Sequence, residues 1–266
     1  MREPLRHDIA NGDIWGLEAG DYVAEIATVG ATLGRLAWRD HDLVVPLGDP
    51  ASPTAYAPAY LGKVLAPWPN RIRDGRYMWD GVAHETAISE PATSTALHGL
   101  VCWQEWRVVG SPSRDRIVLG TDVYPRPGYP FRVGLTLVAD LDPHVGLTLT
   151  LTARNLGETD APYGVAFHPY LRCGAGTIND CVLELPATTV ATVDARLLPT
   201  GTAPAAAEGL DFTTGARISD RRIDHALTGL PAGGWEASLT RPGMPWRTTL
   251  RADTAWVQLY TADYLH

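Results

Sequence analysis

The 266-residue sequence has little cysteine, no long apolar run and no block of basic residues. Three cysteines, an odd and sparse set, do not make a disulfide framework and indicate a reducing cytoplasm. No apolar segment approaches the roughly 18 residues of a membrane-spanning helix, and charges interrupt residues 1–15 where a secretory signal would need an apolar core. The formal charge of -8 argues against a nucleic acid or an anionic membrane as partner.

Motifs for cofactors and metals are also missing. The sequence has no glycine-rich dinucleotide or phosphate loop, no H-E-x-x-H, no C-x-x-C pair and no G-x-S-x-G turn. We therefore expect no cofactor and no metal site, and an α/β-hydrolase is disfavoured.

What the sequence does contain is a series of short strand patterns. Its 26 glycines and 21 prolines are spread along the chain, which suits short strands better than helices. Strand patterns cover residues 22–29, 32–38, 42–45, 106–110, 116–123, 131–140, 145–154, 181–185, 235–240, 248–252 and 255–261. The clearest alternates Leu and Thr over residues 147–152, and Asp80-Gly81 predicts a hairpin turn. A weak helical pattern occurs only around residues 58–65. We predict an all-β fold, a large antiparallel β-sandwich forming one domain over residues 1–266.

Four polar segments stand out from this pattern. Asn70 and Arg71 lie on a stiff stretch between prolines and Gly75, and His98 lies between leucine and glycine. His168 precedes a proline at a predicted strand end, and Asp224 lies in a partly apolar segment. Each has an ordinary alternative: a solvated turn for Arg71, a core histidine for His98, a solvent-facing histidine for His168, and a structural ion pair for Asp224.

Together, and in this order, these segments resemble the aldose 1-epimerase (galactose mutarotase) family. The resemblance rests on Asn70-Arg71-Ile72 with Asp74-Gly75, Leu97-His98-Gly99-Leu100, His168-Pro169-Tyr170, and Asp224-His225. Each segment alone is weak evidence, whereas the ordered set is specific and spans residues 65–227. It implies the large galactose mutarotase-like supersandwich.

The resemblance also implies an activity, the cofactor-free interconversion of α and β anomers of an aldose. Ring opening needs a base at the C1 hydroxyl and an acid at the ring oxygen. By the family's pattern His168 is the acid and His98 assists at the ring oxygen, while Arg71 and Asp224 bind sugar hydroxyls. Histidine suits the acid role because its ordinary pKa is about 6.5. Asn70 and Tyr170 complete the expected substrate-binding set.

One departure from the family concerns its general base, a glutamate that follows the Tyr-Thr strand. In this sequence Tyr260-Thr261 is followed by only five residues. The glutamates at positions 85, 90, 184, 208 and 236 do not match that place. Two explanations remain: the base lies in C-terminal strands beyond His266, or the protein is a non-catalytic relative. We favour the first, because a sandwich ending at Thr261 would leave an exposed strand edge.

Three hypotheses of different classes follow. The first is an aldose 1-epimerase, an isomerase, of a hexose or, alternatively, of a hexose 6-phosphate that Arg71 and Arg73 would grip. The second is a carbohydrate-binding relative without activity, and the third is a purely structural domain. Aromatic residues favour the first two, with Trp68, Trp103 and Tyr170 as candidates for stacking on a sugar. The expected partner is a small-molecule sugar, and the expected state is a monomer or homodimer in the cytoplasm.

Overall fold

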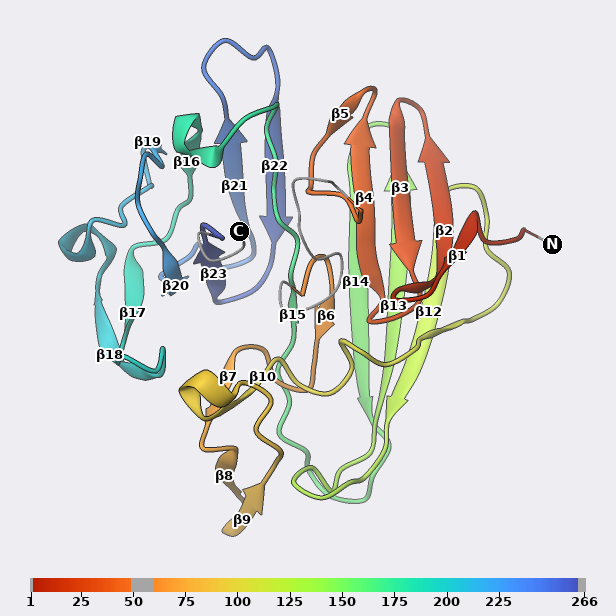
Figure 1. The fold of residues 1–266 in the computed structure, drawn as a ribbon, viewed down its shortest axis with the longest axis vertical. Coiled ribbons are helices and arrows are strands. Elements are labelled where there is room, and N and C mark those ends of the chain that lie inside the picture. The colour runs from red at the N-terminus through yellow and green to blue at the C-terminus, as the bar shows by residue number, and fades with distance from the viewer. Residues whose placement is uncertain (1, 49–59, 263–266) are drawn as a thin grey trace. The chain divides into compact units, whose positions relative to one another are not determined.

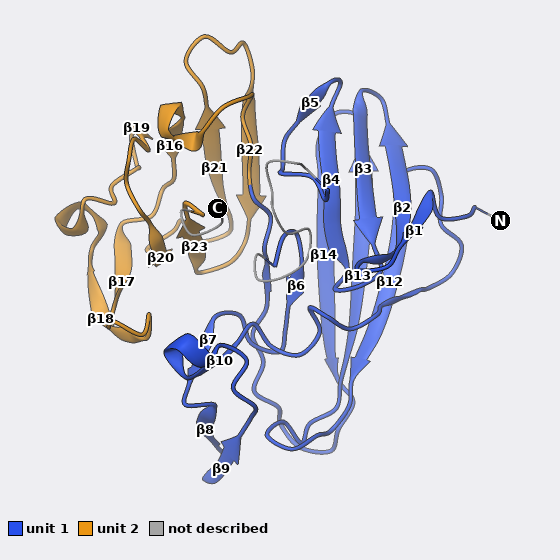
Figure 2. Ribbon diagram, viewed as in Figure 1, with its two compact units in different colours: residues 1–170 blue, residues 171–266 orange. Residues whose placement is uncertain are grey.

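The computed structural model describes residues 2–48 and 60–262 (Figure 1). These residues form strands, named β1–β23, and three short 3-10 helices, named η1–η3. The prediction of an all-β antiparallel fold is therefore confirmed. The chain divides into two compact units, Met1–Tyr170 and Leu171–His266 (Figure 2). One domain over residues 1–266 stays a prediction. Among the described residues, no helix has the length and apolarity needed to cross a membrane.

Two antiparallel sheets form the framework of the first unit. The first contains β1 (Arg6–Asp8), β2 (Gly12–Ala19), β3 (Tyr22–Ala27), β4 (Thr32–Trp38) and β5 (His41–Asp42), in that order. The second contains β11 (Arg107–Val108), β12 (Arg116–Val123), β13 (Val133–Asp142) and β14 (Gly146–Asn155). Strands β2 and β3 pack on β13, whose side chains alternate between buried and half-buried. On β14 the threonines are exposed and the leucines half-buried, as the Leu-Thr alternation predicts.

Three short ladders complete this unit. They pair β6 (Val64–Leu65) with β15 (Ala166–Phe167), β7 (Arg71–Arg73) with β10 (Thr95–Leu97), and β8 (Arg76–Trp79) with β9 (Val82–Glu85), and η1 (Pro91–Thr93) precedes β10. The Asp80-Gly81 hairpin is confirmed, since both residues have positive φ, as a tight turn of this kind requires. The weak helical pattern over 58–65 is wrong where it can be compared, because Val64–Leu65 is a strand; residues 58 and 59 lie outside the described residues.

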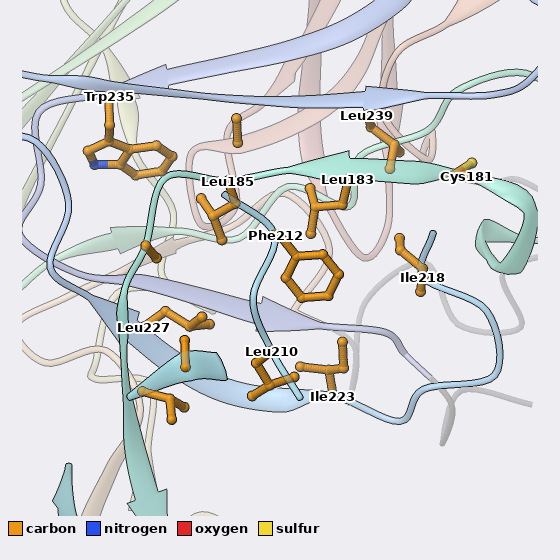
Figure 3. Close-up of a cluster of buried hydrophobic side chains, with 14 of the residues drawn as sticks. Cys181, Leu183, Leu185, Leu210, Phe212, Ile218, Ile223, Leu227, Trp235 and Leu239 are labelled. Atoms are coloured by element: carbon orange, nitrogen blue, oxygen red, sulfur yellow. The ribbon is translucent and has the colours of Figure 1, made fainter. Parts of the chain in front are cut away.

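The second unit is a smaller pair of sheets. One contains β19 (Ala216–Arg217), β16 (Val182–Glu184), β21 (Trp235–Thr240) and β22 (Arg247–Ala252); the other contains β18 (Pro199–Pro204), β17 (Thr189–Val193), β20 (Asp224–Thr228) and β23 (Val257–Tyr260). Helices η2 (Ile178–Asp180) and η3 (Ala205–Glu208) lie in connections. Apolar side chains from both sheets, among them Leu183, Leu227 and Leu239, gather around Phe212 (Figure 3). This cluster is the core of the unit.

Phe212 is 1% exposed at the centre of that cluster, so its truncation tests the core. We expect Phe212→Ala to lower the free energy of unfolding by about 3–5 kcal/mol, because the ring loses its contacts and leaves a cavity. Urea unfolding followed by circular dichroism measures this change. Val145→Ala, at a side chain that is 65% exposed, is the control and should change stability by less than about 0.5 kcal/mol. Equal stability of the two variants would contradict this description of the core.

Candidate functional site

The ladder between β7 and β10 positions Arg71 and His98. Leu97 pairs with Arg71, so His98 follows directly at the end of the ladder. The His98 N–H donates to the carbonyl oxygen of Asn70 at 3.0 Å, and the Asn70 N–H donates to Nδ1 of the His98 ring at 3.1 Å. Both residues have positive φ, 59° for Asn70 and 62° for His98. Such backbone is uncommon for residues other than glycine and is held here by reciprocal hydrogen bonds.

Gly99 brings the end of β10 against the chain that follows β6. Its φ is 73°, and a Cβ atom at this position would lie 2.2 Å from the carbonyl oxygen of Ala66. The Leu100 N–H donates to that same oxygen at 2.7 Å. Only glycine combines this backbone conformation with this close approach, which explains why a glycine follows His98.

The ladder between β6 and β15 brings in His168. Phe167 pairs with Val64, and the His168 N–H donates to the carbonyl oxygen of Lys63 at 3.0 Å. The His168 carbonyl oxygen accepts the Gly62 N–H at 2.8 Å. The prediction of a histidine at a strand end is therefore confirmed. Its ring meets the His98 ring edge to face, with centroids 5.4 Å apart.

Aromatic rings surround the two histidines. Tyr60 lies with its ring centroid 4.6 Å from that of His98 and 6.4 Å from that of His168, and Tyr170 lies 5.2 Å from His168. Trp103, 43% exposed, contacts Tyr60 with centroids 5.3 Å apart. Burial raises the pKa of Tyr60 to about 12, so its hydroxyl keeps its proton at neutral pH.

The ammonium group of Lys63 packs against the ring of Trp103. Its Nζ is 4.6 Å from the indole centroid, and it donates to Thr32 Oγ1 at 3.3 Å and to the Val29 carbonyl oxygen at 3.4 Å. The side chain has no exposure to solvent, and this burial lowers the pKa of Lys63 to about 8.

His98 is held as a neutral ring. The pKa of His98 is lowered to about 3, mainly by burial and further by the charges of His168 and Arg71, while Glu90 opposes the shift. A backbone N–H can only donate, so Nδ1 of His98 is an acceptor and the ring proton lies on Nε2. His98 therefore offers one fixed N–H donor rather than a mobile acidic proton.

Arg71 is held by an ion pair in this neighbourhood. Its Nε donates to Oε2 of Glu90 at 2.7 Å and its Nη2 to Oε1 at 3.0 Å, a two-bond arrangement with a planar fit. Its Nη1 donates to Oδ1 of Asn70 at 3.2 Å. The Arg71 side chain is 12% exposed.

The sequence-predicted residues thus divide between the two units. The structure brings Asn70, Arg71, His98, His168 and Tyr170 together in the first unit. Asp224 begins β20 in the second unit, where its Oδ1 accepts a hydrogen bond from Gln258 Nε2 at 2.6 Å.

Of the stacking candidates, Trp103 and Tyr170 are part of the aromatic surroundings described above. Trp68 instead packs against Tyr129, with centroids 6.1 Å apart, and donates from Nε1 to the Ala96 carbonyl oxygen at 3.3 Å. Both contacts of Trp68 are to residues of the first unit.

Sequence reasoning missed Tyr60, Lys63 and the pairing of Glu90. Glu90 comes eight residues before His98, and only its place beside a proline before the Leu-His-Gly segment could have drawn attention to it. Over residues 2–48 and 60–262 no group of three or more His, Cys, Asp or Glu residues is arranged to hold a metal ion.

Comparison with known proteins agrees with the fold. The sequence model of the aldose 1-epimerase family matches residues 13–266. The uncharacterized protein YihR of Escherichia coli K12 is 35% identical over 255 residues, 96% of this chain and 81% of that protein. YphB of the same organism is 30% identical over 159 residues, 59% of this chain and 51% of that protein. The chain therefore belongs to the aldose 1-epimerase family.

Solved structures show the same fold. An aldose epimerase homologue from Caenorhabditis elegans superimposes with a TM-score of 0.75 at 18% identity, over 86% of this chain and 75% of that one. A galactose 1-epimerase from Lactobacillus acidophilus gives a TM-score of 0.72 at 21% identity, over 90% of this chain and 75% of that one. The predicted galactose mutarotase-like sandwich is confirmed.

The neutral state of His98 is open to direct measurement. We expect nitrogen-15 NMR to find His98 as the Nε2–H tautomer from about pH 8 down to about pH 4, whereas an ordinary histidine titrates near 6.5. Between the pKa of about 3 for His98 in the folded protein and the ordinary value of about 6.5, the unfolded chain binds more protons than the folded one. His98 therefore makes the fold less stable as the pH falls from about 6.5 toward 3. Titration of this ring near pH 6.5 would contradict the expectation.

Proposed function

We propose that this protein is an aldose 1-epimerase that interconverts the α and β anomers of an aldose by acid–base ring opening. The observation that carries the proposal is the pair of contacting histidine rings, one of them fixed as a neutral Nε2–H donor, beside a positioned arginine. Family membership supports the same reading.

In the proposed reaction a base removes the proton of the C1 hydroxyl while His168 donates a proton to the ring oxygen. The bond between C1 and the ring oxygen breaks, giving the open-chain aldehyde. Rotation about C1–C2 and the reverse proton transfers close the ring as the other anomer. His98 assists by donating its Nε2–H to the ring oxygen, where negative charge develops as the bond breaks.

Substrate binding is the proposed role of the neighbouring polar groups. Arg71 and Asn70 would bind sugar hydroxyls, and Tyr170 would contact the sugar beside His168. Asp224 is proposed as a further hydroxyl ligand, from the family's pattern. Glu90 does not suit the role of base, because both carboxylate oxygens bind Arg71 and the pKa of Glu90 is lowered to about 2.

The proposal is tested by polarimetry of freshly dissolved α-D-glucose, α-D-galactose and glucose 6-phosphate. We expect the protein to accelerate the change in optical rotation over buffer for at least one of them. Acceleration for the phosphate alone would favour a sugar-phosphate epimerase. Binding detected by calorimetry without acceleration would favour the non-catalytic carbohydrate-binding relative. The absence of both binding and acceleration would contradict the epimerase and the carbohydrate-binding hypotheses alike.

His168→Asn tests the acid. We expect mutarotation to fall by at least about a hundred-fold with the fold intact, because asparagine keeps a polar side chain but cannot transfer the proton. His144→Asn, in the exposed turn between β13 and β14, serves as the control and should keep full activity. Wild-type turnover in the His168 variant would remove the acid assignment.

Arg71→Ala tests the binding role. We expect KM to rise about ten-fold or more with a smaller fall in kcat, as for a group that binds ground state and transition state alike. Arg76→Ala is matched, because Arg76 also pairs with a glutamate, Glu85, but is 70% exposed. A drop in kcat with KM unchanged would argue against a binding role for Arg71.

A further inference from the structure

The carboxylate that holds Arg71 belongs to a segment with no role in the proposed reaction. Glu90 lies between β9 and β10, at the start of η1. Its side chain is 24% exposed and that of Arg71 is 12% exposed, so water screens this pair less than exposed pairs. The Arg76–Glu85 pair, which joins β8 to β9, shows the contrast with 70% and 66% exposure.

Glu90 is itself fixed by several bonds. The hydroxyl groups of Thr93 and Thr95 both donate to Oε2, the latter at 2.9 Å. The backbones of Glu90 and Thr95 exchange two hydrogen bonds, at 3.0 and 3.2 Å, and Thr95 is fully buried. Burial alone would raise the pKa of Glu90, but the bonds from Arg71 and the two threonines outweigh it. The carboxylate is therefore charged and set in one orientation.

One strand connects this carboxylate to the histidine. Strand β10 begins at Thr95, which binds Glu90, and ends at Leu97, which pairs with Arg71 and precedes His98. Glu90, Arg71 and His98 are thus placed by the same ladder. Their charges also act on one ring, since Arg71 disfavours the protonated form of His98 and Glu90 favours it. Loss of the Glu90 charge would leave the Arg71 charge uncompensated beside His98.

We propose that Glu90 is a positioning residue that fixes the Arg71 guanidinium in the orientation in which it binds the sugar. This inference rests on the proposed function and deepens it. Two parallel bonds define the plane of the guanidinium as well as its position, so the donors that face the substrate are oriented before it arrives. A flexible arginine would lose conformational entropy each time the sugar binds.

The decisive variant is Glu90→Gln, which keeps the shape of the side chain and removes its charge. We expect KM to rise about ten-fold and kcat to change less than about three-fold, because the variant loosens a binding group. If the ion pair were purely structural, Glu90→Gln would lower the stability of the protein and leave KM unchanged in the folded protein. Glu85→Gln removes the same charge from the exposed pair and should leave both constants unchanged.

A double-mutant cycle with Arg71→Ala shows whether Glu90 acts through the arginine. On the Arg71→Ala background, Glu90→Gln should raise KM no further, since no guanidinium remains to be oriented. A second full rise in KM on that background would overturn the inference. Glu90→Asp, which keeps the charge but shortens the side chain, should raise KM less than Glu90→Gln, and it provides the test if the glutamine variant does not fold.

Failure of this inference is distinguishable from failure of the proposed function. If the wild-type protein accelerates mutarotation and Glu90→Gln behaves as Glu85→Gln does, positioning by Glu90 is wrong while the epimerase proposal stands. A fall in kcat at constant KM would also overturn it, because that pattern indicates a role in proton transfer. If the wild-type protein accelerates the mutarotation of none of the sugars tested, the proposed function fails and this inference fails with it.

Discussion

The candidate site depends on the register of the short ladder between β7 and β10. Leu97 lies opposite Arg71, and Thr95 lies opposite Arg73. Side chains alternate along a strand, so a slip of one residue would turn the Arg71 side chain to the other face, away from Glu90. The reciprocal bonds between Asn70 and His98 close the end of this ladder and hold the His98 ring at the same time. One backbone register therefore sets an arginine, its carboxylate and a histidine together.

Burial shapes the ionisation of the groups around this ladder. The pKa of His98 falls to about 3, that of Lys63 falls to about 8 and that of Tyr60 rises to about 12, with burial as the main cause in each case. For His98 and Tyr60 the neutral form is thereby favoured at neutral pH. Glu90 stays charged, because hydrogen bonds from Arg71 and two threonines outweigh burial and lower its pKa to about 2. Such a setting supplies one oriented donor, the Nε2–H of His98.

The sequence predicted several of the long strands but missed β2 and β18, which have eight and six residues. Predicted strands 116–123 and 235–240 coincide with β12 and β21, because alternation over six or more residues is a strong signal. Strands of two or three residues such as β6, β7 and β10 escaped, since they are too short to show a period. Arg71, His98 and His168 were found from their local segments. Tyr60 and Glu90 were not, because their contacts join residues far apart in the chain and follow only from the register of those short ladders.

These two outcomes have a common physical cause. A long strand that buries one face of a sheet, such as β13, has an alternating sequence that is easily recognised. A site needs side chains aimed at one point, and here that aim comes from interruptions of the strands: positive φ at Asn70, His98 and Gly99. Such backbone breaks the pattern that identifies strands, and reciprocal bonds and close approaches offset its cost. The positions where periodicity fails are therefore the positions where chemistry is to be sought, and the sandwich around them supplies the rigidity that keeps them in place.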